Sequence, residues 1–156
     1  MPTKLGSTLL FTALGLVTLN ALAHDHEAHV VPEAERKLAA TLEASGPTAN
    51  KGIESINKLG SVDLSREFPG IGQRELRARE LTIAPGGVVA VHQHEQRPGL
   101  AYILEGEITE HRSDQTAPVL RKAGDVAFEN SGITHWWENT SNAVVRALVV
   151  DIILSP

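Results

Sequence analysis

Two stretches decide the fold of this chain: residues 86–106, GGVVAVHQHEQRPGLAYILEG, and residues 124–139, GDVAFENSGITHWWEN. In both, short runs rich in Val, Ile and aromatic residues are separated by Gly, Pro, Asn or Asp. Apolar runs that turn residues interrupt at regular intervals indicate β-strands joined by tight turns. The two stretches therefore predict β-structure with histidines on its strands.

The same pattern extends over the rest of the chain from residue 61 onward. It predicts strands at residues 74–83, 88–94, 100–105, 107–112, 119–122, 126–129, 135–138 and 143–153. So many short strands in one span favour an all-β fold, a double-sheet jelly roll closed into a small barrel. We place this barrel at residues 61–156.

The first 23 residues have the features of an export signal. Lys4 gives a positive start, residues 9–19 form an apolar stretch, and Ala21-Leu22-Ala23 supplies a small-residue cleavage pattern. The apolar stretch is too short for a membrane anchor, so we expect no membrane span after cleavage. Residues 1–23 are thus predicted to be a signal peptide, and the mature chain to be exported, either periplasmic or secreted.

Residues 24–60 read as a polar tail followed by a short helical leader. Apolar residues recur at four-residue spacing from Ala34 to Leu42, and Gly46-Pro47 ends the pattern. Residues 53–59 fit one further short helical turn.

Composition excludes several classes of function. The formal net charge is −5, and no stripe of Lys or Arg is present, so nucleic acid is not an expected partner. The chain has no cysteine, which excludes disulfides, thiolate metal ligands and cysteine nucleophiles.

His92 and His94 are the first candidates for chemistry. Side chains alternate along a strand, so residues two apart lie on the same face, and both imidazoles could reach one cation. The pair alone also fits two unrelated polar positions, because His24 and His26 repeat the spacing in the polar tail.

The surroundings of the histidine pair resemble the cupin superfamily. Its first motif runs Gly-x5-His-x-His-x3-4-Glu-x6-Gly, and its second runs Gly-x5-Pro-x-Gly-x2-His-x3-Asn. The matching positions are Gly86, His92, His94 and Gly106 for the first motif, and Gly124, Gly132, His135 and Asn139 for the second. The resemblance implies a cupin double-stranded β-helix that holds one divalent transition metal ion on His92, His94 and His135. Zinc, iron, copper and manganese all remain open as the ion.

Two positions depart from the family pattern. Asn130 replaces the proline of the second motif, and Gly99 stands where the first motif has its metal-binding glutamate. Glu95 follows His94 directly and is expected to point to the opposite face. Three neutral imidazoles leave the metal charge uncompensated, and a glycine at position 99 leaves a vacant volume beside it. Both features favour a small anionic ligand in the remaining coordination positions.

Four further residues are candidates for a substrate pocket or a second metal site. Arg97 could pair with a carboxylate at the barrel mouth, or be an ordinary loop residue. Trp137 shares a strand face with His135 and could line a pocket beside Gly99, or only pack in the core. After cleavage, His24 and His26 would offer an amine and a third-position imidazole suited to Cu(II) or Ni(II), although the pattern favours a simple hydrophilic tail.

These observations leave two functional hypotheses. The first is a small metal-dependent enzyme of oxygenase or isomerase type that acts on a small anionic organic molecule. The second is a non-enzymatic exported cupin that binds or senses a metal ion or metabolite. A homodimer is the expected assembly.

Overall fold

The computed structural model describes residues 45–155, and every regular element in that range is a β-strand. The strands are β1 (Lys51–Asp63), β2 (Arg74–Gln93), β3 (Gly99–Glu105), β4 (Glu107–Arg112), β5 (Val119–Lys122), β6 (Val126–Glu129), β7 (Thr134–Glu138) and β8 (Val145–Leu154). The predicted all-β class is confirmed. The expected signal peptide, the polar tail and the helical repeat at residues 34–42 lie outside the described residues.

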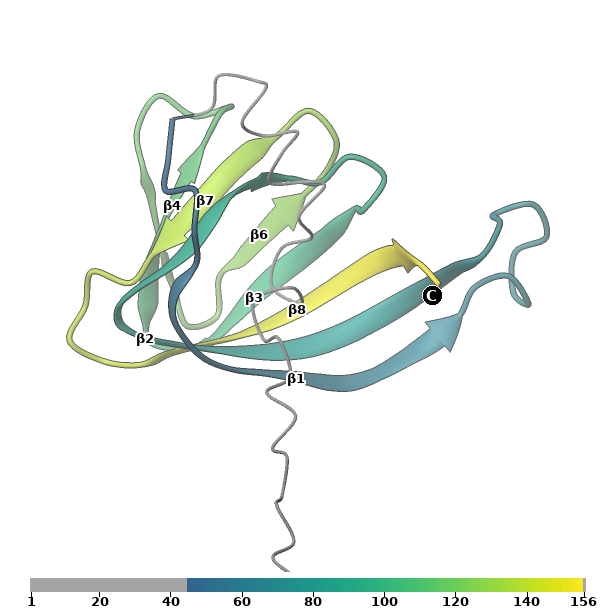
Figure 1. Ribbon diagram of the computed structural model, residues 1–156, viewed down its shortest axis with the longest axis horizontal. Coiled ribbons are helices and arrows are strands. Elements are labelled where there is room, and N and C mark those ends of the chain that lie inside the picture. Colours follow the sequence, from purple (N-terminus) through teal and green to yellow (C-terminus); the bar gives the residue numbers. More distant parts are fainter. Residues whose placement is uncertain (1–44, 156) are drawn as a thin grey trace, which may run out of the picture.

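The strands form one strongly curved antiparallel sheet, in the order β5-β4-β7-β2-β8-β3-β6, with β1 paired to β2. Strand β2 links its two halves: residues 74–83 pair with β8, whereas residues 88–93 pair with β7. Between them lies Pro85-Gly86-Gly87, where Gly86 has a φ of 70°, which glycine adopts without steric cost. The result is a nearly closed barrel whose two halves face each other across the core (Figure 1).

The structure corrects the sequence prediction at the start of the barrel. Residues 53–59, predicted as a helical turn, belong to β1 and pair with β2 before residue 61. The helix-like spacing has a simple cause. A register shift lets Ile53 face Ile83 and Ile56 face Leu81, so two residues three apart in β1 share one face of the sheet. Both isoleucines pack against the core. A bulged strand thus imitates helical periodicity.

The other predicted strands are present, with one change of connectivity. The runs at 74–83 and 88–94 are the two halves of a single bent strand, β2. Together with the missed β1, this again gives eight strands in the part of the chain that is described.

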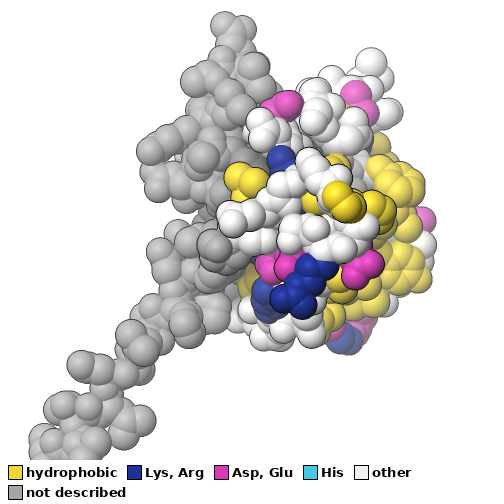
Figure 2. Space-filling model, turned by 90° about the vertical axis from the view of Figure 1, so that its right-hand side faces the viewer, with side chains coloured by type: hydrophobic (Ala, Val, Ile, Leu, Met, Phe, Trp, Pro, Cys, Tyr) yellow, Lys and Arg dark blue, Asp and Glu magenta, His cyan; other side chains and the backbone are white. Residues whose placement is uncertain are grey.

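Inward-facing side chains fill one end of the barrel with hydrocarbon and the other end with ionisable groups. The hydrophobic core consists of Leu81, Ile83, Val89, Ala101, Ile103, Ile108, Ala127, Trp137, Val145, Ala147 and Val149. Outward positions include exposed apolar residues such as Tyr102, Leu104 and Phe128. Hydrophobic side chains also gather along one side of the face in Figure 2. Within residues 45–155, no helix has the length and apolar character needed to cross a membrane.

Candidate metal centre

A bulge in β2 places the first histidine of the site. Val89 lies opposite Trp137, and His92 lies opposite His135. Between these two pairs the chain advances three residues along β2 but only two along β7, so β2 contains one extra residue. The bulge returns His92 to the inward face that Val89 also occupies. The segment before β1 is hydrogen-bonded to the bulge. The amide of Ala90 donates to Asn50 Oδ1 at 2.8 Å, and the amide of Val91 donates to the Pro47 carbonyl at 2.8 Å.

The three histidines named from the sequence come together inside the barrel. His92, His94 and His135 are each at most 4% exposed, and one ligand atom from each lies within 4.8 Å of the others. The Nε2 atom of His135 is 3.0 Å from Nε2 of His94 and 3.0 Å from Nε2 of His92. Two nitrogens bound at right angles to one ion, each about 2.1 Å from it, would be about 3.0 Å apart.

Hydrogen bonds on the opposite ring nitrogens fix the tautomers. His92 Nδ1 donates to the carbonyl of Ala90 at 2.8 Å, and His94 Nδ1 donates to the carbonyl of Arg97 at 3.1 Å. Carbonyl oxygens only accept, so the proton of each neutral ring must be on Nδ1. His135 Nδ1 donates in the same way to the carboxylate of Glu110 at 2.8 Å.

This arrangement suits a cation. Burial lowers the pKa of His94 to about 2, with the charge of Arg97 adding to the effect. Burial also holds the pKa of His92 well below its ordinary value, followed by the effects of His135 and His94. The neutral rings of His92 and His94 therefore turn their Nε2 lone pairs toward Nε2 of His135, where a cation can accept them. The cluster suggests a site for a divalent metal ion.

Glu110 on β4 fixes the orientation of the His135 ring. Glu110 was not identified from the sequence as a residue of the site. It is fully buried, and besides His135 it contacts Arg112 Nη1 at 2.8 Å and Arg121 Nη2 at 2.8 Å. Burial raises its pKa, but the hydrogen bonds from His135 and Arg112 outweigh burial, so the net pKa is below the usual range. Glu110 is therefore an anion that orients the ring and makes its Nε2 a better donor to metal.

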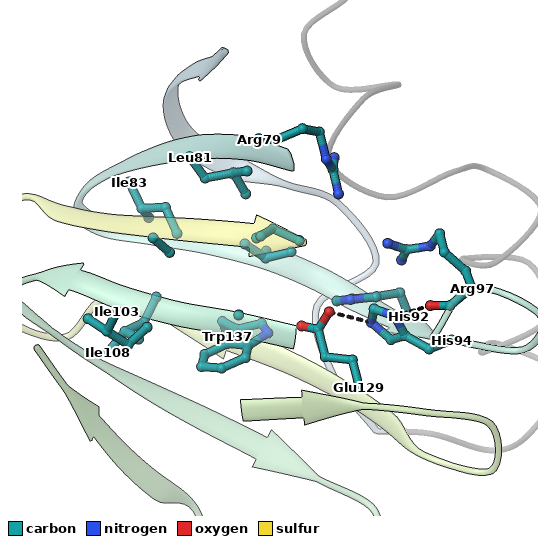
Figure 3. A pocket seen from close by; sticks show the side chains of 14 residues that line it. Arg79, Leu81, Ile83, His92, His94, Arg97, Ile103, Ile108, Glu129 and Trp137 are labelled. Carbon is teal, nitrogen blue, oxygen red and sulfur yellow. Dashed lines mark hydrogen bonds and ion pairs between the residues drawn. The ribbon is translucent and has the colours of Figure 1, made fainter. Parts of the chain in front are cut away.

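A second carboxylate, Glu129 at the end of β6, lies beside the histidines. It is 4% exposed; its Oε2 is 3.5 Å from His94 Nε2, and its Oε1 is 3.9 Å from His135 Nε2. Figure 3 shows it directed from β6 toward His94. Burial, the largest cause, raises the pKa of Glu129 in this metal-free environment.

A buried carboxylate on β8 gathers the arginines of this end of the barrel. Asp151 is fully buried and accepts hydrogen bonds from Arg77 at 2.8 Å, Arg79 at 2.9 Å and Arg97 at 2.9 Å. Burial raises the pKa of Asp151, but the hydrogen bond from Arg77 and the charges of the three arginines bring it below its ordinary value. Three guanidinium groups around one carboxylate leave this region positively charged.

A cavity of about 40 Å³ connects the histidines to the apolar core. His92, His94, Arg79, Arg97 and Glu129 line its polar end, and core residues including Ile103 and Trp137 line the rest (Figure 3). A water needs about 10–15 Å³ measured in this way, so the space suits a few waters or a very small molecule.

The remaining sequence candidates have definite positions. Arg97 is only 5% exposed, and the carboxylate it contacts is the protein's own Asp151. Trp137 is buried in the cavity wall, with its ring 5.6 Å from that of His135. His24 and His26 lie outside the described residues.

The expectation of a vacant volume at Gly99 is wrong. A Cβ atom on Gly99 would lie 2.6 Å from the Val150 carbonyl oxygen and 3.0 Å from Asp151 Cβ. The reason is the tight pairing of β3 with β8, in which Gly99 lies directly opposite Asp151. The glycine permits close approach of two strands and does not open space beside the histidines.

The residues that sequence reasoning missed share one signal. Arg79, Glu110, Glu129 and Asp151 are charged, yet each stands two residues from a buried apolar side chain on its own strand: Leu81, Ile108, Ala127 and Val149, respectively. A charge at an inward position of an alternating strand is costly unless it is paired. Such a break in the pattern could have marked all four.

Comparison with known proteins agrees with this geometry. Residues 79–151 match the family described as Cupin domain, so this part of the chain is a domain of the cupin superfamily. An oxalate-binding protein of Thermotoga maritima is 40% identical over 74 residues, which cover 47% of this chain and 60% of that protein. A germin-like protein of Oryza sativa subsp. japonica is 29% identical over 87 residues, covering 53% and 41%. The chain thus matches less than two thirds of either relative.

Among solved structures, that of a predicted oxalate decarboxylase from Thermotoga maritima is 29% identical, with a TM-score of 0.46, covering 68% of this chain and 99% of that one.

Proposed function

We propose that this chain is a metal-dependent cupin enzyme that acts on a small carboxylate anion of the oxalate class. The ion would be held by His92, His94 and His135. The observation that carries the proposal is the convergence of three buried Nε2 atoms at the polar end of a cavity, next to two buried arginines. When bound, a divalent ion supplies Lewis acidity, and a redox-active ion adds one-electron chemistry with dioxygen.

The charge around the cavity supports an anionic ligand. Arg79 and Arg97 line the cavity together with Glu129, and Arg77 joins both arginines on Asp151. Three guanidinium groups thus stand against two carboxylates, so positive charge exceeds negative charge on that side. Asp151 holds the guanidinium groups of Arg79 and Arg97 in fixed orientations, which lowers the entropic cost of binding a carboxylate. The oxalate-binding relative from Thermotoga maritima supports the same class of ligand, and the cavity volume favours an anion of few atoms.

The shape and polarity of the cavity favour catalysis over capture alone. Ionisable groups stand beside the histidines, and apolar residues around Trp137 and Ile103 limit access of water to the other end. Charged groups act more strongly on a reacting molecule in such a water-poor site than in bulk solvent. An entirely apolar barrel would offer no group to orient the substrate or move a proton.

A second candidate is binding without turnover, which the printed name of the oxalate-binding relative favours. One experiment decides between the two. The purified chain is stripped of metal, reloaded separately with zinc, manganese, iron or copper, and titrated with oxalate in a calorimeter. We expect oxalate to bind only to a metal-loaded form, and consumption of oxalate with release of carbon dioxide or uptake of oxygen in at least one of them.

The outcomes are distinct. Binding in a metal-loaded form without any consumption of oxalate supports the capture function. If the stripped protein takes up none of the four ions, or if a His135→Ala variant binds them as tightly as the unchanged chain, the metal site itself is wrong. Acetate serves as the monocarboxylate control and should bind more weakly because it offers one carboxylate.

Export and assembly remain part of the proposal. Cleavage after Ala23 would place the mature chain outside the cytoplasm, and amino-terminal sequencing of protein from the cell envelope or medium tests this. Comparing the metal content of the mature chain with a form beginning at Val30 tests a second site on His24 and His26. Sedimentation measurements test the expected homodimer.

A further inference from the structure

Glu129 occupies a special position relative to the missing glutamate of the first motif. Strands β3 and β6 are antiparallel, and Glu129 is the direct register partner of Gly99. Directly opposed residues in such a pair project to the same face of the sheet, with Cβ positions about 5 Å apart. A side chain on β6 can therefore reach the region that a side chain at position 99 would have served.

Position 99 itself cannot supply the group. Its Cβ would meet the carbonyl oxygen of Val150 at 2.6 Å, so any side chain there requires the backbone of β8 to move. The carboxylate that does lie near the histidines comes from another strand: Glu129 of β6, with Oε2 3.5 Å from His94 Nε2.

Glu129 has an unsatisfied oxygen on the side of the histidines. Its carboxyl group is buried, and Oε2 has no hydrogen-bond partner. A buried polar atom in that state costs free energy, roughly 1–3 kcal/mol. The same Oε2 lies 3.5 Å from His94 Nε2, and Oε1 lies 3.9 Å from His135 Nε2. Donor atoms that share one ion, each about 2.1 Å from it, are about 3.0–3.4 Å apart, so a small shift of the carboxylate completes the set.

We propose that Glu129 is the fourth protein ligand of the metal, supplied by β6 in place of the glutamate absent from β3. This inference rests on the proposed three-histidine site. A bound Glu129 lowers the net charge of a divalent centre from +2 to +1, and the oxygen donor favours harder ions such as manganese over copper. Arg79 and Arg97 in the cavity wall then contribute positive charge toward an anionic ligand, in addition to the reduced +1 charge of the metal centre.

The test is metal affinity by chelator competition for Glu129→Gln, measured for Mn(II) and Cu(II). Glutamine keeps the shape of the side chain and removes its charge. We expect at least a tenfold loss of affinity for Mn(II), a smaller loss for Cu(II), and hence a shifted Mn/Cu selectivity. Glu138→Gln is the matched control, because Glu138 contacts His111 on the other side of β7; it should leave both affinities unchanged.

The failures of this inference and of the proposed site are separable. If the unchanged chain binds no metal, the three-histidine site fails and the inference falls with it. If the unchanged chain binds metal and Glu129→Gln binds it equally well, only the role of Glu129 is refuted. An equal loss for Mn(II) and Cu(II), accompanied by a lower unfolding temperature of the metal-free variant, also contradicts ligation and indicates a structural role.

A measurement on the unchanged chain covers the case in which the variant does not fold. A crystal structure of the Mn(II)-loaded protein should place a Glu129 oxygen within about 2.2 Å of the ion. An ion held by three imidazoles with the carboxylate at its present distance would overturn the proposal.

Discussion

Replacing Glu110 by Gln should weaken metal binding without touching a metal ligand. The Glu110 carboxylate accepts from His135 Nδ1 at 2.8 Å, from Arg112 Nη1 at 2.8 Å and from Arg121 Nε at 2.9 Å. Glutamine offers one acceptor oxygen where Glu110 offers two, and its amide group would direct N–H bonds at a guanidinium or at the histidine.

Two magnitudes follow. Loss of a carboxylate behind a metal-binding imidazole lowers metal affinity by about 10–100-fold, which corresponds to about 1.4–2.7 kcal/mol. Breaking a buried ion pair by removing one partner costs about 3–5 kcal/mol of folding free energy. Arg112 retains its contacts with Asp114, so we expect the lower end of that range. Arg121 would lose its ion pair with Glu110, which is the larger part of the cost.

The assay separates the two effects. Chelator competition gives the metal affinity, and chemical denaturation of the metal-free protein gives the free energy of unfolding. Val145→Ala is the control, since Val145 is fully buried in the hydrophobic core, away from the polar end of the barrel. Its truncation should lower the free energy of unfolding by about 2 kcal/mol. Metal affinity of Glu110→Gln equal to that of the control, at comparable loss of stability, would refute the role of Glu110 in orienting His135.

Three further predictions concern position 99, acidity and the source of metal. Gly99→Ala should destabilise the protein by about 1–3 kcal/mol through overpacking against β8, whereas Gly60→Ala, where a Cβ meets nothing within 4 Å, should be neutral in the same denaturation assay. The metal-free protein should lose stability as pH falls from about 6.5, because burial lowers the folded-state pKa of His94 to about 2 and the unfolded chain therefore binds the proton first. His94→Gln should flatten that slope; an unchanged slope would contradict the assignment. Protein recovered after export should contain mainly zinc or copper by elemental analysis, and protein made in the cytoplasm without residues 1–23 should be able to acquire iron; stoichiometric iron after export would contradict this.

Much of this protein could be predicted from local patterns. Eight runs of β-forming residues and the turn residues between them mark the seven strands β2 to β8, with two runs in the bent β2, because strand formation and chain reversal depend on neighbouring residues. The inward direction of His92, His94 and His135 followed from motif spacing, and the structure brings the three rings together. The strand β1 was misread because its bulges give Ile53 and Ile56 the spacing of a helix.

Only the tertiary structure decided what surrounds the histidines. Glu110 meets His135 across the β4–β7 pair, Glu129 meets His94 from β6, and Asp151 on β8 gathers arginines from β2 and from the loop before β3. Each of these contacts joins residues 25 or more positions apart, and a shift of one residue in register would turn the charged side chain to the opposite face of the sheet. Sequence therefore determined the three histidines that could carry the chemistry. The register between distant strands determined which charges stand beside them, because burial forces each inward charge to find a partner across the barrel.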